Sequence, residues 1–324
     1  MIDLVNLPRS DHFYLERLAD GVYAAIARDS GAAISNAGII DLGDRTLVFD
    51  SFLTPWAGED LRRIAELLTQ RPVDTLINSH YHNDHIRGNQ SFPKQTEIIA
   101  TLKTERLMRL KGAEELDWDL ENALTQLTAL EQRLRQEKND TRRREIGYWI
   151  TYYRVIVESL PILVLRFPNQ TFANEVTYHG LQRTARLISY GAGHTEDDAF
   201  LYLPEDGIAF LGDLLFTGCH PYVADGDYAA WLDYLKKIDS LELKIAVPGH
   251  GLVGAQEDIH LLEKYLITLD ATVRQVIEDK NPLEQIIRQP IPDEFATWRF
   301  PDFYSKNLRS LYERLTTQED PQGS

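Results

Sequence analysis

Three histidines and an aspartate lie within six residues of the chain, in the order His-x-His-x-Asp-His. They are His80, His82, Asp84 and His85. Residues two apart in an extended segment point to the same side, so His80 and His82 can present two imidazoles to one metal ion. Asp84 and His85 are adjacent and must point differently, which suits a second ion close by. Helical metal motifs place histidines four apart, so this spacing belongs to a loop that follows a strand.

Three further candidate ligands, His194, Asp213 and His250, each follow a short predicted strand, and a glycine directly precedes each of them. Glycine permits sharp turns and a close approach of backbone to a ligand. If the strands end at the same edge, these side chains converge with the first cluster. Imidazole nitrogen and carboxylate oxygen without a thiolate suit Zn²⁺, and they leave Fe²⁺ and Mn²⁺ open.

Together these motifs resemble those of the metallo-β-lactamase superfamily. The matching segments are His80-Tyr81-His82-Asn83-Asp84-His85, Gly193-His194-Thr195, Gly212-Asp213-Leu214-Leu215-Phe216 and Pro248-Gly249-His250-Gly251. In element order the resemblance extends from about Gly21 to Gly251. It implies an αββα sandwich with a dinuclear site in which His80, His82 and His194 bind one ion, Asp84, His85 and His250 bind the other, and Asp213 bridges them. The chain differs from members with a cysteine at Asp213 and from flavin-linked members with a glutamate at His82.

A site with two metal ions can activate water and polarise a carbonyl or phosphoryl oxygen. We therefore expect two Zn²⁺ ions and a hydrolase that acts on a small-molecule ester, thioester, lactone or lactam. Asp84 would orient the attacking hydroxide and would accept and return a proton. One alternative is an iron oxidoreductase that resembles the persulfide dioxygenases, with a single iron held by His80, His194 and Asp213. A phosphodiesterase or nuclease is a third candidate, and a non-catalytic binding module is a fourth.

Other polar residues near the motifs leave two interpretations open. Thr195, Asp197 and Asp198 either hydrogen-bond a ligating imidazole or cap the turn before the next strand. His220 and Tyr222 either contact the substrate or belong to a surface loop.

The elements that must position these residues fall into two strand-rich halves. The first half has predicted strands at residues 22–26, 36–42, 46–50 and 75–78 and a helix ending near residue 71; the second begins near Thr171 and has strands at 184–189, 199–203, 207–211 and 244–247 and a helix at 229–238. Two such halves predict an α/β fold, an αββα sandwich of two mixed β-sheets flanked by helices.

A helical hairpin is predicted as an insertion between the halves, at about 113–160. Leucines from Leu116 to Leu134 recur at spacings of three and four and predict an apolar face, with Glu115 and Asp119 on other faces. Its role is open between packing on its own domain, a lid over the site and an oligomer contact. A C-terminal helical extension is expected at about 255–317, and residues 1–324 are interpreted as one domain.

Composition restricts the partners of the protein. The 324 residues include 50 acidic and 34 basic ones, for a net charge of -16. Such a surface repels phosphate backbones, which argues against nucleic acid.

Cys219 is the only cysteine and favours a reducing compartment. No apolar run reaches the ~20 residues of a membrane span, and the N-terminus lacks the pattern of a secretory signal. We expect a cytoplasmic enzyme with a small-molecule substrate and no membrane partner, and a homo-oligomer formed through the insertion is one expected assembly.

Overall fold

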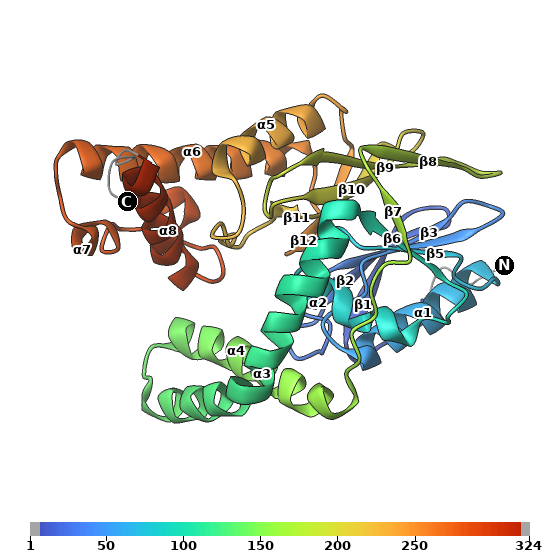
Figure 1. Ribbon diagram of the computed structural model, residues 1–324, viewed down its shortest axis with the longest axis horizontal. Helices are drawn as coiled ribbons and strands as arrows, with labels where there is room; N and C mark the ends of the chain where they lie inside the picture. The colour runs from blue at the N-terminus through green and yellow to red at the C-terminus, as the bar shows by residue number, and fades with distance from the viewer. Residues whose placement is uncertain (1–6, 319–324) are drawn as a thin grey trace.

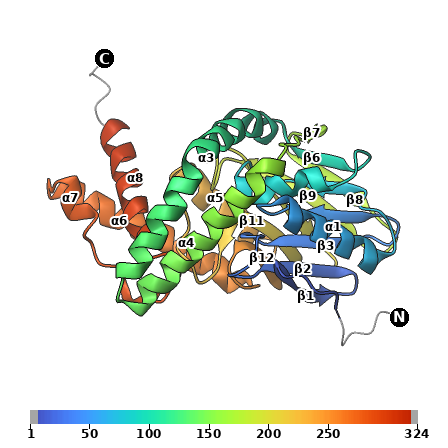
Figure 2. The same cartoon turned by 90° about the horizontal axis from the view of Figure 1, so that it is seen from below.

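The computed structural model describes residues 7–318 as two β-sheets packed face to face, with helices outside them and further helices gathered at one end (Figures 1 and 2). The strands are β1 Phe13–Ala19, β2 Val22–Ala27, β3 Ala37–Asp41, β4 Thr46–Phe49, β5 Thr75–Ile77, β6 Glu97–Thr101, β7 Gln170–Phe172, β8 Glu175–His179, β9 Thr184–Gly191, β10 Asp198–Leu203, β11 Ile208–Phe216 and β12 Ile245–His250. The α-helices are α1 Pro55–Thr69, α2 Asn83–Ile86, α3 Leu102–Gln136, α4 Asp140–Ser159, α5 Tyr228–Asp239, α6 Gln256–Glu278, α7 Leu283–Ile286 and α8 Asp302–Gln318.

Both sheets are mixed. The first has the order β1-β2-β3-β4-β5-β6-β7, antiparallel up to β4 and parallel from there on. The second has the order β12-β11-β10-β9-β8, and only the β11–β12 pair is parallel. This arrangement confirms the predicted αββα sandwich.

Burial of apolar side chains explains the layers. Ile40 and Leu47 of the first sheet share a core between the sheets with Leu201 and Phe210 of the second. The apolar face of α1 covers the outer side of the first sheet, and α5 and α6 cover the second. Each sheet buries apolar side chains on both of its faces, and this burial stabilises the packing of the layers. The ends of the strands in the two sheets therefore keep fixed positions relative to one another.

The insertion between the halves is the hairpin of α3 and α4. Helix α3 begins at Leu102 and not near Ala113, because the side chain of Thr101 caps it by accepting a hydrogen bond from Thr104 N at 3.0 Å. The turn expected at Asn139 is present, and its side chain caps α4 by accepting from Arg142 N at 3.0 Å.

The predicted leucine face of α3 is wrong in its middle part. Leu127 is buried among residues of α4, but Leu120 and Leu124 are 60% and 64% exposed. Asp119 is buried instead, because its carboxylate pairs with the buried guanidinium of Arg87 at 2.6 Å. The side of α3 that carries Asp119 therefore faces Arg87, which belongs to the half of the chain that contains the first ligand cluster.

The C-terminal helices α6, α7 and α8 follow β12; α6 packs on the outer face of the second sheet, and α7 and α8 pack against α6 and each other. Within residues 7–318, none of the helices combines the length and apolarity that crossing a membrane requires. Residues 1–6, on which the expectation of a missing secretory signal partly rests, lie outside the described residues.

Candidate metal centre

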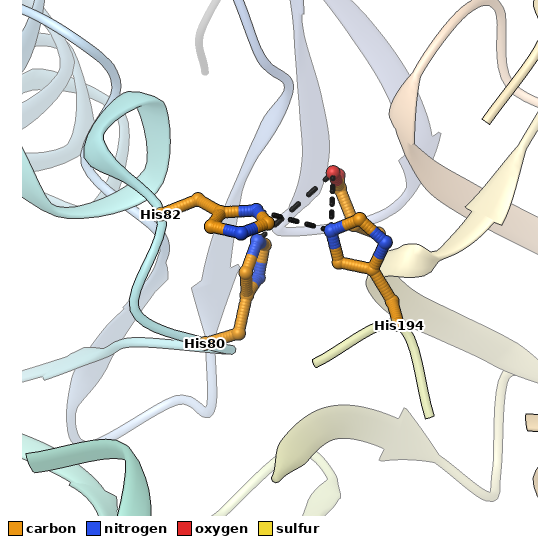
Figure 3. Close-up of side chains that lie close together, drawn as sticks. His80, His82 and His194 are labelled. Atoms are coloured by element: carbon orange, nitrogen blue, oxygen red, sulfur yellow. Dashed lines mark hydrogen bonds and ion pairs between the residues drawn. The ribbon is translucent and has the colours of Figure 1, made fainter. Parts of the chain in front are cut away.

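The structure brings all seven predicted ligands together from the segments after β5 and β9 and from β11 and β12. One group consists of His80, His82, His194 and Asp213, and a second consists of Asp84, His85 and His250; within each group the potential ligand atoms lie within 4.8 Å of one another. Figure 3 shows the imidazoles of His80, His82 and His194 turned toward a common point. The convergence that we expected from strand-end positions is therefore present.

The carboxylate of Asp213 lies between the two groups. Its Oδ2 is 3.3 Å from His194 Nε2 and 4.0 Å from His80 Nε2. Its Oδ1 is 3.2 Å from His85 Nε2 and 3.5 Å from His250 Nε2. One oxygen faces each group, which is the arrangement that a bridging ligand needs.

Local backbone geometry explains how Asp213 reaches this position. It lies inside β11, not after its end, at a break in the register with β12. Gly212 allows this break because its φ of 53° is in the left-handed region. A side chain at Gly249 of β12 would collide with Asp213 Oδ1, so only glycine permits the close approach of the two strands.

A buried hydrogen-bond network behind the cluster fixes two of the histidines. Asp50 accepts from His85 Nδ1, Ser79 N and Ser79 Oγ, each at 2.8 Å, and Ser79 Oγ lies 2.9 Å from His80 Nδ1. With both Nδ1 atoms engaged, the Nε2 atoms of His80 and His85 point to the site. Sequence reasoning missed Asp50, although it follows β4 as the ligands follow their strands.

Asp225 is a second residue that sequence reasoning missed. Its Oδ2 lies 3.0 Å from His82 Nε2, so it holds that imidazole from the loop after β11. Outer carboxylates of this kind orient ligating histidines and raise their basicity. The hydrogen bond to His82 is the largest influence on Asp225 and lowers the pKa of its carboxyl to about 2.

The unpaired atoms in the cluster fit a metal centre. Within the described residues, the buried atoms His80 Nε2, His85 Nε2 and Asp213 Oδ1 make no hydrogen bond, although the last two lie 3.2 Å apart. Buried polar atoms are rarely left unpaired, because desolvation without a partner is costly. Nitrogen and oxygen donors at these distances suit divalent ions such as Zn²⁺. The residues present are therefore appropriate for two ions.

Burial and charge give the histidines different protonation states. Burial lowers the pKa of His194 to about 3, so its imidazole is neutral and ready to ligate. Burial also acts to lower the pKa of His250, but the carboxylates of Asp213 and Asp84 outweigh it and raise that pKa to about 9. His250 therefore carries a proton at neutral pH that a bound ion must displace.

The contacts of nearby residues bear on the interpretations that the sequence left open. Asp198 accepts hydrogen bonds from Thr195 N and Thr195 Oγ1, both at 2.9 Å, and thus caps the turn after His194. His220 fits neither interpretation, because it is fully buried, with its Nδ1 3.0 Å from Tyr265 Oη, and it does not line the cavity above the candidate ligands. Tyr222 lines the cavity above the metal centre.

That cavity has a volume of about 540 Å³ and is open to the ligands. Its floor contains five of the seven, namely His82, Asp84, His194, Asp213 and His250. Its walls come from the α3–α4 hairpin and from the C-terminal segment around α8. The insertion therefore shapes the space in which a substrate would bind.

Comparison with solved structures agrees with the fold. A metallo-β-lactamase from Pontibacter korlensis is 17% identical with a TM-score of 0.56, covering 79% of this chain and 99% of that one. FIM-1 from Pseudomonas aeruginosa, in its mono-zinc form, is 16% identical with a TM-score of 0.58 and coverages of 81% and 98%. A metallo-β-lactamase from Hirschia baltica is 16% identical with a TM-score of 0.56 and coverages of 79% and 98%.

The part shared with this chain spans almost the full length of each of these solved structures, whereas about a fifth of this chain lies outside the shared part. At such low identity the likeness establishes the fold alone. The family match rests on the sequence: residues 30–250 match the family described as the metallo-beta-lactamase superfamily, and this segment contains all seven clustered ligands. The chain therefore belongs to the metallo-β-lactamase superfamily.

Proposed function

We propose that this protein is a hydrolase that binds two divalent ions, with Zn²⁺ preferred, and cleaves a small-molecule ester, thioester, lactone or lactam. The observation that carries the proposal is the position of Asp213, whose two oxygens face different groups of ligand atoms. One ion would be held by His80, His82 and His194 and the other by Asp84, His85 and His250, with Asp213 shared between them.

Bound divalent ions would lower the pKa of a water molecule toward neutrality and polarise the carbonyl oxygen of the substrate. Asp84 directs Oδ2 to His250 Nε2 at 3.2 Å and lines the cavity, so its Oδ1 is available to orient water and to hold a proton. In the proposed reaction the water oxygen bonds to the carbonyl carbon. The bond from that carbon to the leaving oxygen, sulfur or nitrogen atom breaks, and the leaving atom receives a proton.

The proposal is tested by substitutions in the cluster. His82→Ala and Asp213→Ala are expected to lower the zinc content and abolish turnover of an ester, thioester, lactone and lactam panel, while circular dichroism stays that of the folded protein. His179→Ala is the matched control, because His179 is exposed on β8 and lies outside both ligand groups. Unchanged turnover in both cluster variants would contradict the proposal.

The same measurements separate the hydrolase from the competing functions. A single iron per chain with oxygen consumption would favour the oxidoreductase that uses His80, His194 and Asp213. Full metal content without turnover across the panel would favour a binding module. Cleavage of RNA would favour a nuclease, which the net charge of -16 argues against.

The cytoplasmic location expected from the single cysteine stays a prediction, as does assembly through the insertion. Exposed Leu120 and Leu124 on α3 are consistent with such an assembly. Light scattering of the purified protein and of a Leu124→Lys variant would test it, because a charge in an apolar contact should shift an oligomer toward smaller species.

A further inference from the structure

The cavity above the ligands lies between two parts of the chain that are far apart in sequence. Figures 1 and 2 show the α3–α4 hairpin and the C-terminal helices at the same end of the molecule, beyond the sheets. Residues of α4 and residues 300–306 both line the cavity. Its volume of about 540 Å³ is in the range of small-molecule sites.

Aromatic rings form a continuous wall across this cavity. Trp149 lies 5.5 Å from Tyr152 on α4, and 5.8 Å from both Phe300 and Phe303 of the C-terminal segment, between ring centroids. Phe303 lies 5.7 Å from Tyr222. All five line the cavity, and we call them the aromatic wall. At its far end, Tyr222 lies 6.5 Å from the ring of the ligand His82.

Contacts outside the cavity hold this wall in place. Tyr152 Oη accepts a hydrogen bond from Asn83 Nδ2 at 3.0 Å. The segment before Phe300 is tied to the loop after β11, because Arg299 N donates to Gly218 O at 3.0 Å and His220 N donates to Arg299 O at 2.9 Å. Phe300 itself has a φ of 61°, which is uncommon for a bulky residue and is tolerated where surrounding contacts hold the backbone. The rings are therefore positioned before any ligand binds, which lowers the cost of binding.

The chemical character of the lining selects one kind of ligand. Eight of the lining residues are Phe, Trp or Tyr, whereas two, Ile34 and Leu130, are aliphatic. An aromatic ring of a ligand packs on such side chains in offset or edge-to-face geometry, whereas a flexible alkyl chain loses conformational entropy when it is ordered on binding. Apart from the candidate ligands, the charged residues in the lining are Glu115, Asp225, Glu145, Asp302, Arg133 and Lys306.

We propose that the substrates carry a planar aromatic ring within a few atoms of the scissile carbonyl, and that Trp149 and Phe303 determine this specificity by packing on the ring. The inference rests on the proposed hydrolase function and names the substrate class for the same site. Trp149 and Phe303 bind the substrate and take no part in the bond-breaking step.

The test compares 2-naphthyl acetate with octyl acetate, and ethyl 2-naphthoate with ethyl decanoate. The zinc-loaded protein is compared with Trp149→Leu and Phe303→Leu, so that differences in intrinsic reactivity cancel. We expect the naphthyl-to-alkyl ratio of kcat/KM to fall about tenfold in each variant for at least one pair, with little change for the alkyl ester. Trp118→Leu is the matched control, because Trp118 is also on the insertion but is exposed and does not line the cavity. Ratios unchanged in both wall variants would overturn the inference.

A binding measurement distinguishes failure of this inference from failure of the proposed function. Calorimetric titration of the metal-free protein with 2-naphthamide should show binding that Trp149→Leu weakens about tenfold and Trp118→Leu leaves unchanged. If no ester of either kind is hydrolysed but this pattern appears, the hydrolase proposal fails and the aromatic site stands. If esters are hydrolysed but neither the ratios nor the titration depend on Trp149 or Phe303, the aromatic site fails and the hydrolase stands.

Discussion

The side-chain amide of Asn83, between the ligands His82 and Asp84, donates a hydrogen bond to Glu115 Oε1 at 2.7 Å. Its second hydrogen goes to Tyr152 Oη at 3.0 Å. Glu115 is on α3 and Tyr152 is on α4, so both helices of the insertion are attached to the segment that carries four of the candidate ligands. The insertion is thus part of the support of the candidate metal centre as well as a wall of the cavity above it.

Loss of the Glu115 acceptor should destabilise the fold. In Glu115→Ala one hydrogen of the Asn83 amide loses its acceptor at the wall of the cavity, which costs about 0.5–1.5 kcal/mol of unfolding free energy. Urea denaturation of the metal-free protein at pH 7 measures this difference. The adjacent Glu114→Ala is the control, because Glu114 is exposed, and its effect should stay within about 0.5 kcal/mol. Equal effects of the two substitutions would contradict the supporting role of Glu115.

Asp50 should control metal affinity from behind the cluster. Its side chain is fully buried and accepts three hydrogen bonds, one of them from His85 Nδ1. In Asp50→Asn the side-chain NH₂ group would face at least one of these three donors in place of an acceptor oxygen. We expect the hydrogen bond that orients His85 to be lost. Substitutions of such outer partners typically lower metal affinity 10–100-fold, and we expect an effect of this size in zinc competition with a chromophoric chelator. Asp44→Asn, in the exposed turn between β3 and β4, should leave the affinity unchanged. A change below threefold in Asp50→Asn would refute the prediction.

The fold and the seven clustered ligands could be predicted from the sequence because both depend on local patterns. Strands such as β3 and β4 are short β-rich runs joined by a turn, and the candidate ligands other than Asp213 lie at or after the ends of such strands. In contrast, β1 carries charged residues, Glu16 and Arg17, in its middle, and its pattern does not stand out as a strand. It pairs with β2 at the edge of the sheet, where Glu16 and Arg17 stay exposed.

The residues that support the site could not be predicted because their partners are distant in sequence. His82 and Asp225 are separated by 143 positions, and His85 and Asp50 by 35. The burial of Asp119 likewise depends on its ion pair with Arg87, and the periodicity of the helix sequence does not reveal that pair. Spacing identifies side chains that can bind a metal, but only the folded chain shows which groups hold them.

Zinc binding should release protons near neutral pH. In the metal-free protein Asp213 and Asp84 outweigh burial and raise the pKa of His250 to about 9, so this imidazole is mostly protonated at pH 7. A ligating histidine must be neutral, so the affinity for the ion at this position should rise as the pH rises from 7 to 9 and then level off. Calorimetry in two buffers with different ionisation enthalpies counts the protons released at pH 7. His250→Asn should release about one proton fewer, and an identical count in both proteins would argue against the assignment.

Cys219 should be unreactive in the folded protein. The thiol is 1% exposed, and burial is the largest of the influences that raise its pKa to about 12. At pH 8 only about one thiol in ten thousand would then be ionised, and the reagent would also have to enter the core. We expect negligible reaction with a disulfide reagent at pH 8 in the native state and one thiol per chain in guanidinium chloride. Thr177→Cys supplies an exposed thiol on β8 as a positive control, which should react rapidly while the protein stays folded. Rapid labelling of Cys219 itself in the native protein would show that the loop after β11 opens, and a catalytic role of the thiol would then have to be considered.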